Sequence, residues 1–287
     1  MTAQLSSVAI LGLGIIGTEW ARNLQADGLP VKVWNRTPKN YREEFGGFAA
    51  SASDAVQGAG LVIIVVSDPA AVSEILDAIV PALVPGQIVC QASTVSAEWN
   101  IKFAARVEAT SARFLETPFT GSNPAAQERK TVFYVGGDAL LLAQAEPVLA
   151  RISGTRLHIG PLGSAASLKL AMNMNIAMVS EALAESLRFA RAAGISDEKF
   201  FDALKVNASR APVSDLKEPK LRAGDYAPQF SLKHMHKDLG LAFDTIASAS
   251  SMQGMNLPQI RALKVRYDEG MAQGLGDSDF SVLMKLL

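Results

Sequence analysis

Short runs of apolar residues recur along the first 160 residues, and stretches with helical periodicity, such as 18–26 and 70–80, lie between them. The expected strands are 8–11, 31–34, 61–66, 87–91, 113–116 and 131–135. Several runs are continuously apolar, which is typical of parallel strands that helices cover on both faces. This alternation predicts a doubly wound, mostly parallel α/β sheet.

The strand pattern ends near residue 160, and the remainder of the chain has the pattern of helices. Residues 164–193 contain neither Gly nor Pro; Ser164 is placed to act as the N-cap, and Gly194 supplies a stop signal. Such a helix extends about 45 Å, enough to pass from one domain into another. Further helices are expected over 197–205, 232–250 and 257–273. We therefore expect an α/β domain over 1–163 and an all-α domain over 164–287.

Composition limits the classes of protein that this chain can represent. Of 287 residues, 49% are hydrophobic and 19% are charged, so the chain can bury a large core and is not intrinsically disordered. The net charge of −1 gives no overall attraction to nucleic acid or an anionic membrane. No apolar run is long enough to span a bilayer. The first seven residues lack the features of a secretory signal, so a cytoplasmic location is expected.

A glycine-rich loop follows the first expected strand and precedes a helical stretch. Its glycines have the spacing G-x-G-x-x-G, in which the first allows a tight turn, the second lets a pyrophosphate approach, and the third lets helix and strand pack closely. A purely structural turn is the alternative, but the context on both sides favours dinucleotide binding. The expected contacts come from Gly12, Leu13, Gly14, Ile15, Ile16 and Gly17.

The residues after the second strand bear on the choice of dinucleotide. An NAD-preferring site usually has an acidic residue here that accepts hydrogen bonds from the ribose hydroxyls. This chain has Asn35, Arg36 and Thr37 instead. Arg36 can bind a 2′-phosphate through two N–H groups, and Asn35 and Thr37 can add hydrogen bonds. A solvated turn is the alternative; otherwise the sequence favours NADPH over NADH.

Two further segments are candidates for chemistry. Lys169 lies among apolar residues of the long helix, and Asn173 follows one turn later on the same face. Burial would lower the pKa of the lysine and suit it to proton transfer, although a partly exposed lysine fits the spacing as well. The loop 116–122 offers hydroxyl and backbone N–H groups that can hold a carboxylate, or it is an ordinary turn.

Metal binding is not expected from this sequence. His234 and His236 are two residues apart and do not share a helix face. One cysteine cannot build a cysteine-rich metal site, and there is no H-E-x-x-H pattern.

These motifs together resemble the β-hydroxyacid dehydrogenase family over nearly the whole chain. The order of the glycine loop, Asn-Arg-Thr, a proline–hydroxyl–glycine loop, Lys-x-x-x-Asn and Lys-Asp carries the resemblance. It looks closest to the glyoxylate/succinic semialdehyde reductase branch, on segments 34–37, 67–69, 120–122, 230–234 and 274–277. The resemblance implies an NADP-binding Rossmann domain, an all-α domain joined to it by the long helix, a cleft between the two, and a homodimer or homotetramer.

The resemblance also implies roles for individual residues. Lys169 would be the proton donor, and Asn173 would help to hold it and the substrate. The expected substrate-binding residues are Thr120, Gly121, Ser122, Phe230 and Asp238. Beyond the glycine loop and 35–37, the expected cofactor-binding residues are Val66, Ser67, Ser93, Thr94 and Lys237.

The implied reaction is NADPH-dependent reduction of a small carboxylated aldehyde to the hydroxy acid, with glyoxylate, succinic semialdehyde and tartronate semialdehyde as candidates. A 3-hydroxyisobutyrate-type dehydrogenase and a non-catalytic NADPH-binding module are alternatives, as is an imine reductase, although that group generally lacks the lysine. The chain departs from the usual family pattern at Ile16, Glu19, Trp20, Glu116, Thr117, Phe119, Thr120, Ser122 and Asn123.

Overall fold

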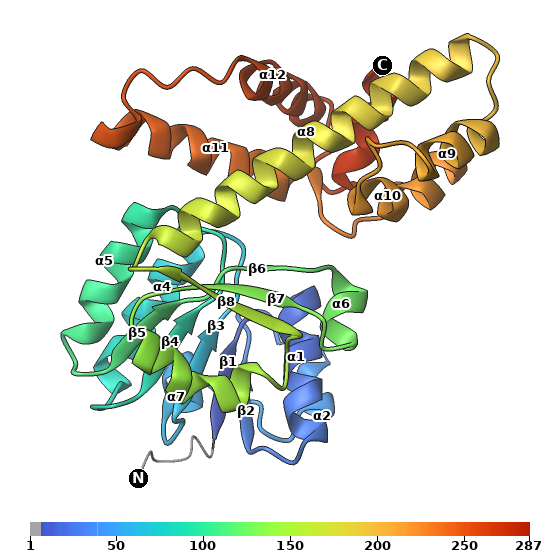
Figure 1. Ribbon diagram of the computed structural model, residues 1–287. Helices are drawn as coiled ribbons and strands as arrows, with labels where there is room; N and C mark the ends of the chain where they lie inside the picture. Colours follow the sequence, from blue (N-terminus) through green and yellow to red (C-terminus); the bar gives the residue numbers. More distant parts are fainter. Residues whose placement is uncertain (1–6, 39) are drawn as a thin grey trace. The chain divides into compact units, whose positions relative to one another are not determined.

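Figure 1 shows the computed structural model of the chain, which describes residues 7–38 and 40–287. The chain divides into two compact units, the first ending at Lys169 and the second beginning at Leu170. The first unit is a Rossmann-like α/β unit with a mostly parallel sheet, and the second is helical. The predicted fold class is therefore confirmed.

The first unit is built on an eight-stranded sheet with the order β2-β1-β3-β4-β5-β7-β6, and β8 pairs with β7. The strands are β1 (Val8–Leu11), β2 (Val31–Trp34), β3 (Leu61–Ile64), β4 (Ile88–Gln91), β5 (Arg113–Glu116), β6 (Phe119–Thr120), β7 (Val132–Gly136) and β8 (Thr155–Gly160). Strands β1 to β5 pair in parallel, whereas β7 runs antiparallel to β5 and β6. The strand order reverses between β1 and β3, and open α/β sheets bind ligands beyond the carboxyl ends at such a point.

Helices cover both faces of this sheet (Figure 1). They are α1 (Ile15–Ala26), α2 (Tyr41–Glu44), α3 (Ala52–Val56), α4 (Pro69–Ile79), α5 (Ala97–Glu108), α6 (Asn123–Gln127) and α7 (Ala139–Leu149). Alternate residues of a strand point to opposite faces, so Val8 and Ile10 enter one hydrophobic core while Ala9 and Leu11 enter the other. Burial on both faces explains why the strand sequence is continuously apolar.

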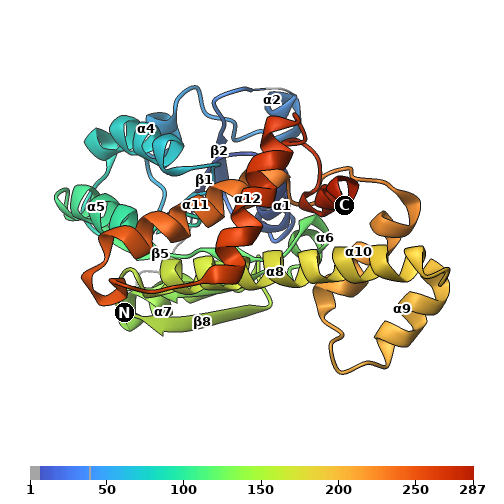
Figure 2. The ribbon, with the colours of Figure 1, turned by 90° about the horizontal axis from the view of Figure 1, so that it is seen from above.

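The second unit contains most of α8 (Ser164–Ala192), whose first six residues, 164–169, belong to the first unit. Figures 1 and 2 show α8 as one unbroken helix, and its 29 residues give a length of roughly 44 Å. The other helices are α9 (Asp197–Lys205), α10 (Pro212–Ala223), α11 (Leu232–Ser248) and α12 (Pro258–Ala272), followed by a 3-10 segment, Phe280–Leu286. Their core is centred on Leu239, Tyr267 and Val282.

The structure differs from the sequence predictions where the local pattern is weak. Strand β8 was not expected, because most of its residues are exposed or half-buried and it lacks an apolar run. Helix α10 contains Pro219, which normally argues against a helix interior. The prediction that Ser164 is the N-cap of the long helix is wrong, because the helix begins at Ser164 itself and Gly163 precedes it.

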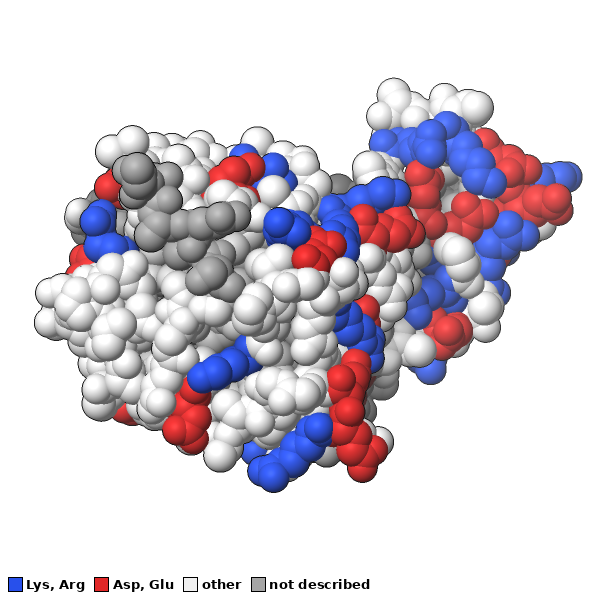
Figure 3. Space-filling model, turned by 90° about the horizontal axis from the view of Figure 1, so that it is seen from below, with Lys and Arg blue, Asp and Glu red and all other residues white. Residues whose placement is uncertain are grey.

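Charged side chains of both signs are interspersed on the face shown in Figure 3, in keeping with the net charge of −1. No helix in the described part of the chain has the length and apolar character needed to cross a membrane.

Candidate functional site

Apart from Lys237, which lies on α11, the residues expected to bind a dinucleotide follow neighbouring strands at one edge of the sheet. Gly12 follows β1, Asn35 follows β2, and Val66 and Ser93 come shortly after β3 and β4. The N–H of Gly12 donates to the carbonyl oxygen of Trp34 (2.9 Å), and the N–H of Val66 donates to Ser93 Oγ (2.8 Å). The structure therefore brings these segments together at the carboxyl end of the sheet, which includes the β1/β3 switch point.

The three glycines of the loop have different surroundings. Gly12 has a φ of +111°, and a Cβ there would lie 2.1 Å from the carbonyl oxygen of Val65. A Cβ on Gly17 would lie 2.0 Å from the carbonyl oxygen of Gly12, whereas a Cβ on Gly14 would meet nothing within 4 Å. Gly12 and Gly17 are thus required by the fold itself. Gly14 leaves open space at the start of α1, which fits a pyrophosphate on the helix N-terminus.

Gly14→Ala is expected to weaken NADPH binding about tenfold or more without unfolding the protein, because the added methyl group occupies space left for the ligand rather than for the protein. The dissociation constant can be measured by the fluorescence of bound NADPH. Gly46→Ala is the matched control, because a Cβ at Gly46 also meets nothing within 4 Å. Equal NADPH affinity in the wild type and Gly14→Ala would contradict this role for the loop.

Asn35 braces the glycine loop rather than facing outward with a free side chain. Its Oδ1 accepts from the N–H of Leu13 (2.9 Å), and its Nδ2 donates to the carbonyl oxygen of Thr37 (2.7 Å). Tyr41 adds a second brace, since its hydroxyl donates to the carbonyl oxygen of Leu13. Tyr41 belongs to no motif that would identify this role from the sequence. The amide of Asn35 contacts the backbone through both Oδ1 and Nδ2. Nδ2 has a second N–H, so the hydrogen bond from Asn35 to a 2′-phosphate stays a prediction.

Arg36 is an exposed cation beside this loop. Its side chain is 76% exposed, and its Nη1 lies 3.2 Å from Oε2 of Glu74, on α4. A solvent-exposed pair of this kind contributes about 0–1 kcal/mol, so an anionic ligand can displace it. Glu74 is a carboxylate that the sequence reasoning did not place near the site, because it lies 38 residues from Arg36 along the chain.

The loop after β3 leads directly into α4. Ser67 Oγ donates to Oδ2 of Asp68 (2.5 Å), and Oδ1 of Asp68 accepts from the N–H of Ala71 (2.9 Å) as the N-cap of the helix. This capping fixes the backbone at Asp68, two residues after Val66. Ser93 is buried and Thr94 is half-buried beside the end of β4.

Aromatic side chains pack beside the loop that is predicted to bind the substrate carboxylate. Trp20 of α1 is fully buried, and its ring contacts Phe119 edge-on with centroids 4.9 Å apart. Two departures from the family pattern, Trp20 and Phe119, are thus one packing pair, and Phe119 directly precedes Thr120 in β6. Gly121 has a φ of +135°, which favours glycine in this turn.

Two buried polar atoms near this loop have no hydrogen-bond partner within the described part of the chain. They are Thr117 Oγ1 and Asn123 Oδ1. Buried polar atoms usually have a partner, so both are candidate contacts for a bound ligand or water. In the sequence, Thr117 and Asn123 stand out only as departures from the usual family pattern.

The two catalytic candidates are buried on α8. Lys169 is 8% exposed, which favours the buried lysine over the exposed alternative, and Asn173 follows one helical turn later. Within the second unit, Asn173 Nδ2 donates to Oδ2 of buried Asp238 (2.6 Å). Lys237 Nζ lies 2.8 Å from Oδ1 of Asp238. Asp238 therefore orients the amide of Asn173 and forms an ion pair with Lys237.

Phe230 is held by a buried ion pair in the second unit. Asp279 Oδ2 accepts from the backbone N–H groups of Gln229 (3.1 Å) and Phe230 (3.3 Å). Lys217 Nζ lies 2.8 Å from Oδ1 of Asp279, and both side chains are almost fully inaccessible to solvent. Neither residue was singled out by the sequence, because they lie 62 residues apart. The pair fixes the backbone that presents Phe230.

His234 and His236 each have a side-chain partner within the second unit. Ser231 Oγ and His234 Nδ1 are 2.7 Å apart, and His236 Nε2 lies 2.7 Å from Oδ1 of Asp268. Among residues 7–38 and 40–287, no group of three His, Cys, Asp or Glu side chains is placed to hold a metal ion.

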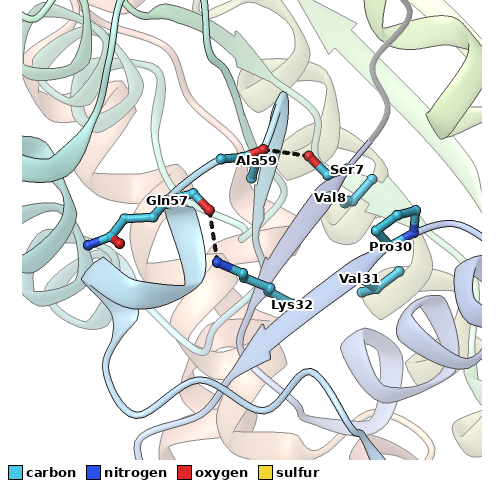
Figure 4. Close-up of a pocket in the computed structure, with 8 residues that line it drawn as sticks. Ser7, Val8, Pro30, Val31, Lys32, Gln57 and Ala59 are labelled. Atoms are coloured by element: carbon cyan, nitrogen blue, oxygen red, sulfur yellow. Dashed lines mark hydrogen bonds between the residues drawn. The ribbon is translucent and has the colours of Figure 1, made fainter.

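A pocket at the opposite edge of the sheet does not coincide with these residues (Figure 4). It lies at the amino ends of β1 and β2 and is lined by Ser7, Val8, Pro30, Val31, Lys32, Gln57, Gly58 and Ala59. Lys32 Nζ donates to the carbonyl oxygen of Gln57 (2.9 Å). Its ammonium group thus caps the C-terminal end of α3.

Two family profiles match this chain, and together they cover nearly all of it. The family profile described as the NAD-binding domain of 6-phosphogluconate dehydrogenase matches residues 7–160. The profile described as NAD-binding of NADP-dependent 3-hydroxyisobutyrate dehydrogenase matches residues 163–287.

Individual relatives match along their length. Glyoxylate/succinic semialdehyde reductase 1 of Arabidopsis thaliana is 30% identical over 97% of both chains. Glyoxylate/succinic semialdehyde reductase 2, chloroplastic, of the same plant is 28% identical over 98% of this chain and 79% of its own length. The structure of Mycobacterium tuberculosis 3-hydroxyisobutyrate dehydrogenase with L-serine matches with a TM-score of 0.87 at 27% identity, covering 98% of this chain and 99% of that one.

Proposed function

Because the chain belongs to the β-hydroxyacid dehydrogenase family of NAD(P)-dependent oxidoreductases, we propose that it reduces a small carboxylated aldehyde with NADPH. Glyoxylate, succinic semialdehyde and tartronate semialdehyde are the candidate substrates. The observation that carries the proposal is the buried Lys169, one turn before an asparagine whose amide a buried carboxylate orients. The two Arabidopsis relatives named for glyoxylate and succinic semialdehyde support the substrate class.

Lys169 is the proposed general acid. When bound, NADPH supplies the hydride that reduces the carbonyl carbon. The ammonium group of Lys169 donates a proton to the carbonyl oxygen as negative charge develops there. Asn173, with its amide fixed by Asp238, offers its Oδ1 to hold the lysine or the substrate.

The cofactor is assigned to the carboxyl edge of the sheet. The glycine loop would hold the pyrophosphate at Gly14, where the backbone is open, and Arg36 would bind the 2′-phosphate. Val66, Ser67, Ser93 and Thr94 are the proposed contacts on the nicotinamide side, and Lys237 of the second unit remains a prediction. Asn35 is proposed to act through the position of Leu13, and Thr37 by its place beside Arg36.

The substrate carboxylate is assigned to the loop after β6. The hydroxyl of Thr120 and the backbone N–H groups of Gly121 and Ser122 are the proposed donors. Phe230 and Asp238 of the second unit remain predicted substrate-side residues. The predicted cytoplasmic location and the predicted homodimer or homotetramer also remain predictions.

Arg36→Ala is expected to lower the preference for NADPH over NADH by about ten- to a hundredfold, because it removes charge-assisted hydrogen bonds to the 2′-phosphate. The change should appear mainly in KM for NADPH, with kcat and KM for NADH nearly unchanged. Steady-state kinetics with both cofactors measures it.

Glu74→Gln is the complementary control for this prediction. It removes the carboxylate that competes for Arg36, so NADPH affinity is expected to rise by a small factor. An unchanged preference in Arg36→Ala would contradict the assignment of the 2′-phosphate to this side chain.

The substrate class is tested by comparing aldehydes with and without a carboxylate. We expect kcat/KM for at least one of glyoxylate, succinic semialdehyde and tartronate semialdehyde to exceed that for methylglyoxal, which carries no carboxylate. A clear preference for methylglyoxal would contradict the role given to the loop of Thr120, Gly121 and Ser122.

A second candidate function is oxidation of a 3-hydroxyisobutyrate-type substrate. The profile matched by residues 163–287 and the mycobacterial structure favour it. Oxidation of 3-hydroxyisobutyrate faster than reduction of every carboxylated aldehyde would select this candidate. The same Lys169 would then accept the proton that it donates in the reductive direction.

A further inference from the structure

Glu116 binds the start of the helix that carries Lys169. It is the last residue of β5 and is fully buried. Its Oε1 accepts from the backbone N–H of Ala165 (2.8 Å), in the first turn of α8. The helix is preceded by Gly163, which has no side chain to act as a cap, so the carboxylate supplied from β5 takes that function.

The second oxygen of Glu116 begins a buried hydrogen-bond chain across the first unit. Oε2 of Glu116 accepts from Asn100 Nδ2 (2.7 Å), and Asn100 Oδ1 accepts from Gln91 Nε2 (2.9 Å). Gln91 Oε1 accepts from the N–H of Ser93. Ser93 Oγ in turn accepts from the N–H of Val66 (2.8 Å). The chain thus runs from the first turn of α8 to the loops proposed to line the nicotinamide.

The fold makes specific room for this carboxylate. A Cβ on Gly136 would lie 2.0 Å from Oε1 of Glu116, so only glycine fits opposite it. Burial raises the pKa of Glu116, and the hydrogen bonds from Ala165 and Asn100 offset that rise only in part. An unpaired buried carboxylate would be strongly unfavourable, so the donors around it are required.

We propose that Glu116 is a positioning residue that places Lys169 by fixing the first turn of α8 and tying it to the cofactor-side loops. The inference rests on the proposed role of Lys169 as proton donor. In an α-helix the N–H of residue 169 bonds the carbonyl oxygen of residue 165. Glu116 therefore binds the N–H of the residue whose carbonyl oxygen supports the lysine. A displacement of about 1 Å at a reacting group can lower the rate about 100-fold.

Glu116→Gln tests this role with little change in size. Its amide nitrogen must face either the N–H of Ala165 or the Nδ2 of Asn100, so one acceptor in the chain is lost. We expect kcat to fall about tenfold or more while the Kd for NADPH changes less than about twofold. Amide hydrogen exchange over 165–169 should become faster. Glu98→Gln, at an exposed position on α5, is the matched control.

The double variant Glu116→Gln/Asn100→Asp restores the order of donors and acceptors. The introduced amide at position 116 would donate to the introduced carboxylate at position 100 and accept from the N–H of Ala165. That carboxylate would still accept from Gln91. We expect the double variant to recover most of kcat and of the exchange protection, although the negative charge has moved. A residue with only a general structural role would not show this reciprocal rescue.

The double variant Glu116→Gln/Lys169→Met tests whether Glu116 affects kcat through Lys169. If Glu116 acts through Lys169, Glu116→Gln should not lower the residual kcat of Lys169→Met any further. An equal fold-loss in both backgrounds overturns the inference, as does wild-type kcat in Glu116→Gln or failure of the folded double variant to recover. Amide hydrogen exchange is measured without turnover. Unchanged exchange over 165–169 in Glu116→Gln would therefore overturn the positioning role of Glu116, even if the protein does not reduce the proposed aldehydes.

Discussion

Lys169→Ala is expected to lower kcat about 10²- to 10⁴-fold, the range that a positioned general acid provides. The dissociation constant for NADPH should stay close to that of the wild type, because the proposed cofactor contacts lie on the glycine loop and the neighbouring strand ends. The loss should appear with every carboxylated aldehyde that is turned over. Steady-state kinetics, together with NADPH binding measured separately, distinguishes the two effects.

Lys169→Met is the matched variant for this prediction. It keeps most of the apolar stem of the buried side chain and removes only the ammonium group. Lys199→Ala on α9 is the control for loss of a lysine elsewhere, and it should leave kcat unchanged. A kcat within about threefold of the wild type in both Lys169 variants would show that another group supplies the proton.

Removal of Asp279 should have the largest effect on stability. Asp279→Ala leaves the ammonium group of Lys217 buried without its carboxylate, and breaking a buried ion pair costs about 3–5 kcal/mol. The free energy of unfolding, from urea denaturation, is expected to fall by that amount. The variant also loses the acceptor for the N–H of Phe230, so aldehyde KM should rise in whatever fraction remains folded.

The control variant Lys217→Met/Asp279→Asn removes both charges and keeps an acceptor for the backbone N–H groups. It should be more stable than Asp279→Ala, because no buried charge is left unpaired. Removing the exposed pair of Lys205 and Asp202 should change stability by less than about 1 kcal/mol. If the midpoint of urea unfolding is the same for Asp279→Ala as for the wild type, the ion pair of Lys217 and Asp279 does not stabilise this unit.

Acid should weaken the same ion pair. Burial alone would raise the pKa of Asp279, but the hydrogen bonds from Lys217 and Ser281 outweigh it and hold the pKa below its ordinary value of 3.8. A carboxyl with a depressed pKa stabilises the fold above its ordinary pKa, and this contribution is lost as the pH falls through the lowered value. Between about pH 7 and about pH 3, the wild type should therefore lose more stability than Lys217→Met/Asp279→Asn.

The parts of the fold that follow from local pattern could be predicted from the sequence. Strands β1, β2 and β5 begin and end at the expected residues, because each apolar run is short and bounded by turn residues. The glycine spacing predicted a tight turn at Gly12 and close packing of helix and strand at Gly17. The structure shows that a Cβ at either position would lie too close to a backbone carbonyl oxygen. The long helix α8 could be predicted because residues 164–193 contain neither Gly nor Pro.

The contacts that organise the candidate site could not be predicted in this way, since they join distant parts of the chain. Glu116 and Ala165 lie 49 residues apart, and Arg36 and Glu74 lie 38 apart. Periodicity and motifs report the neighbourhood of a residue along the chain, not its partner across the fold. The brace between Asn35 and Leu13 is similar, because the motif identified both segments but not the hydrogen bond between them.

The central claim is tested most directly by the oxidation of NADPH, with NADH in parallel, over glyoxylate, succinic semialdehyde, tartronate semialdehyde and methylglyoxal. The proposed function predicts turnover of at least one carboxylated aldehyde, faster with NADPH than with NADH, and formation of the corresponding hydroxy acid. Tight binding of NADPH without oxidation in the presence of any carboxylated aldehyde would contradict the claim.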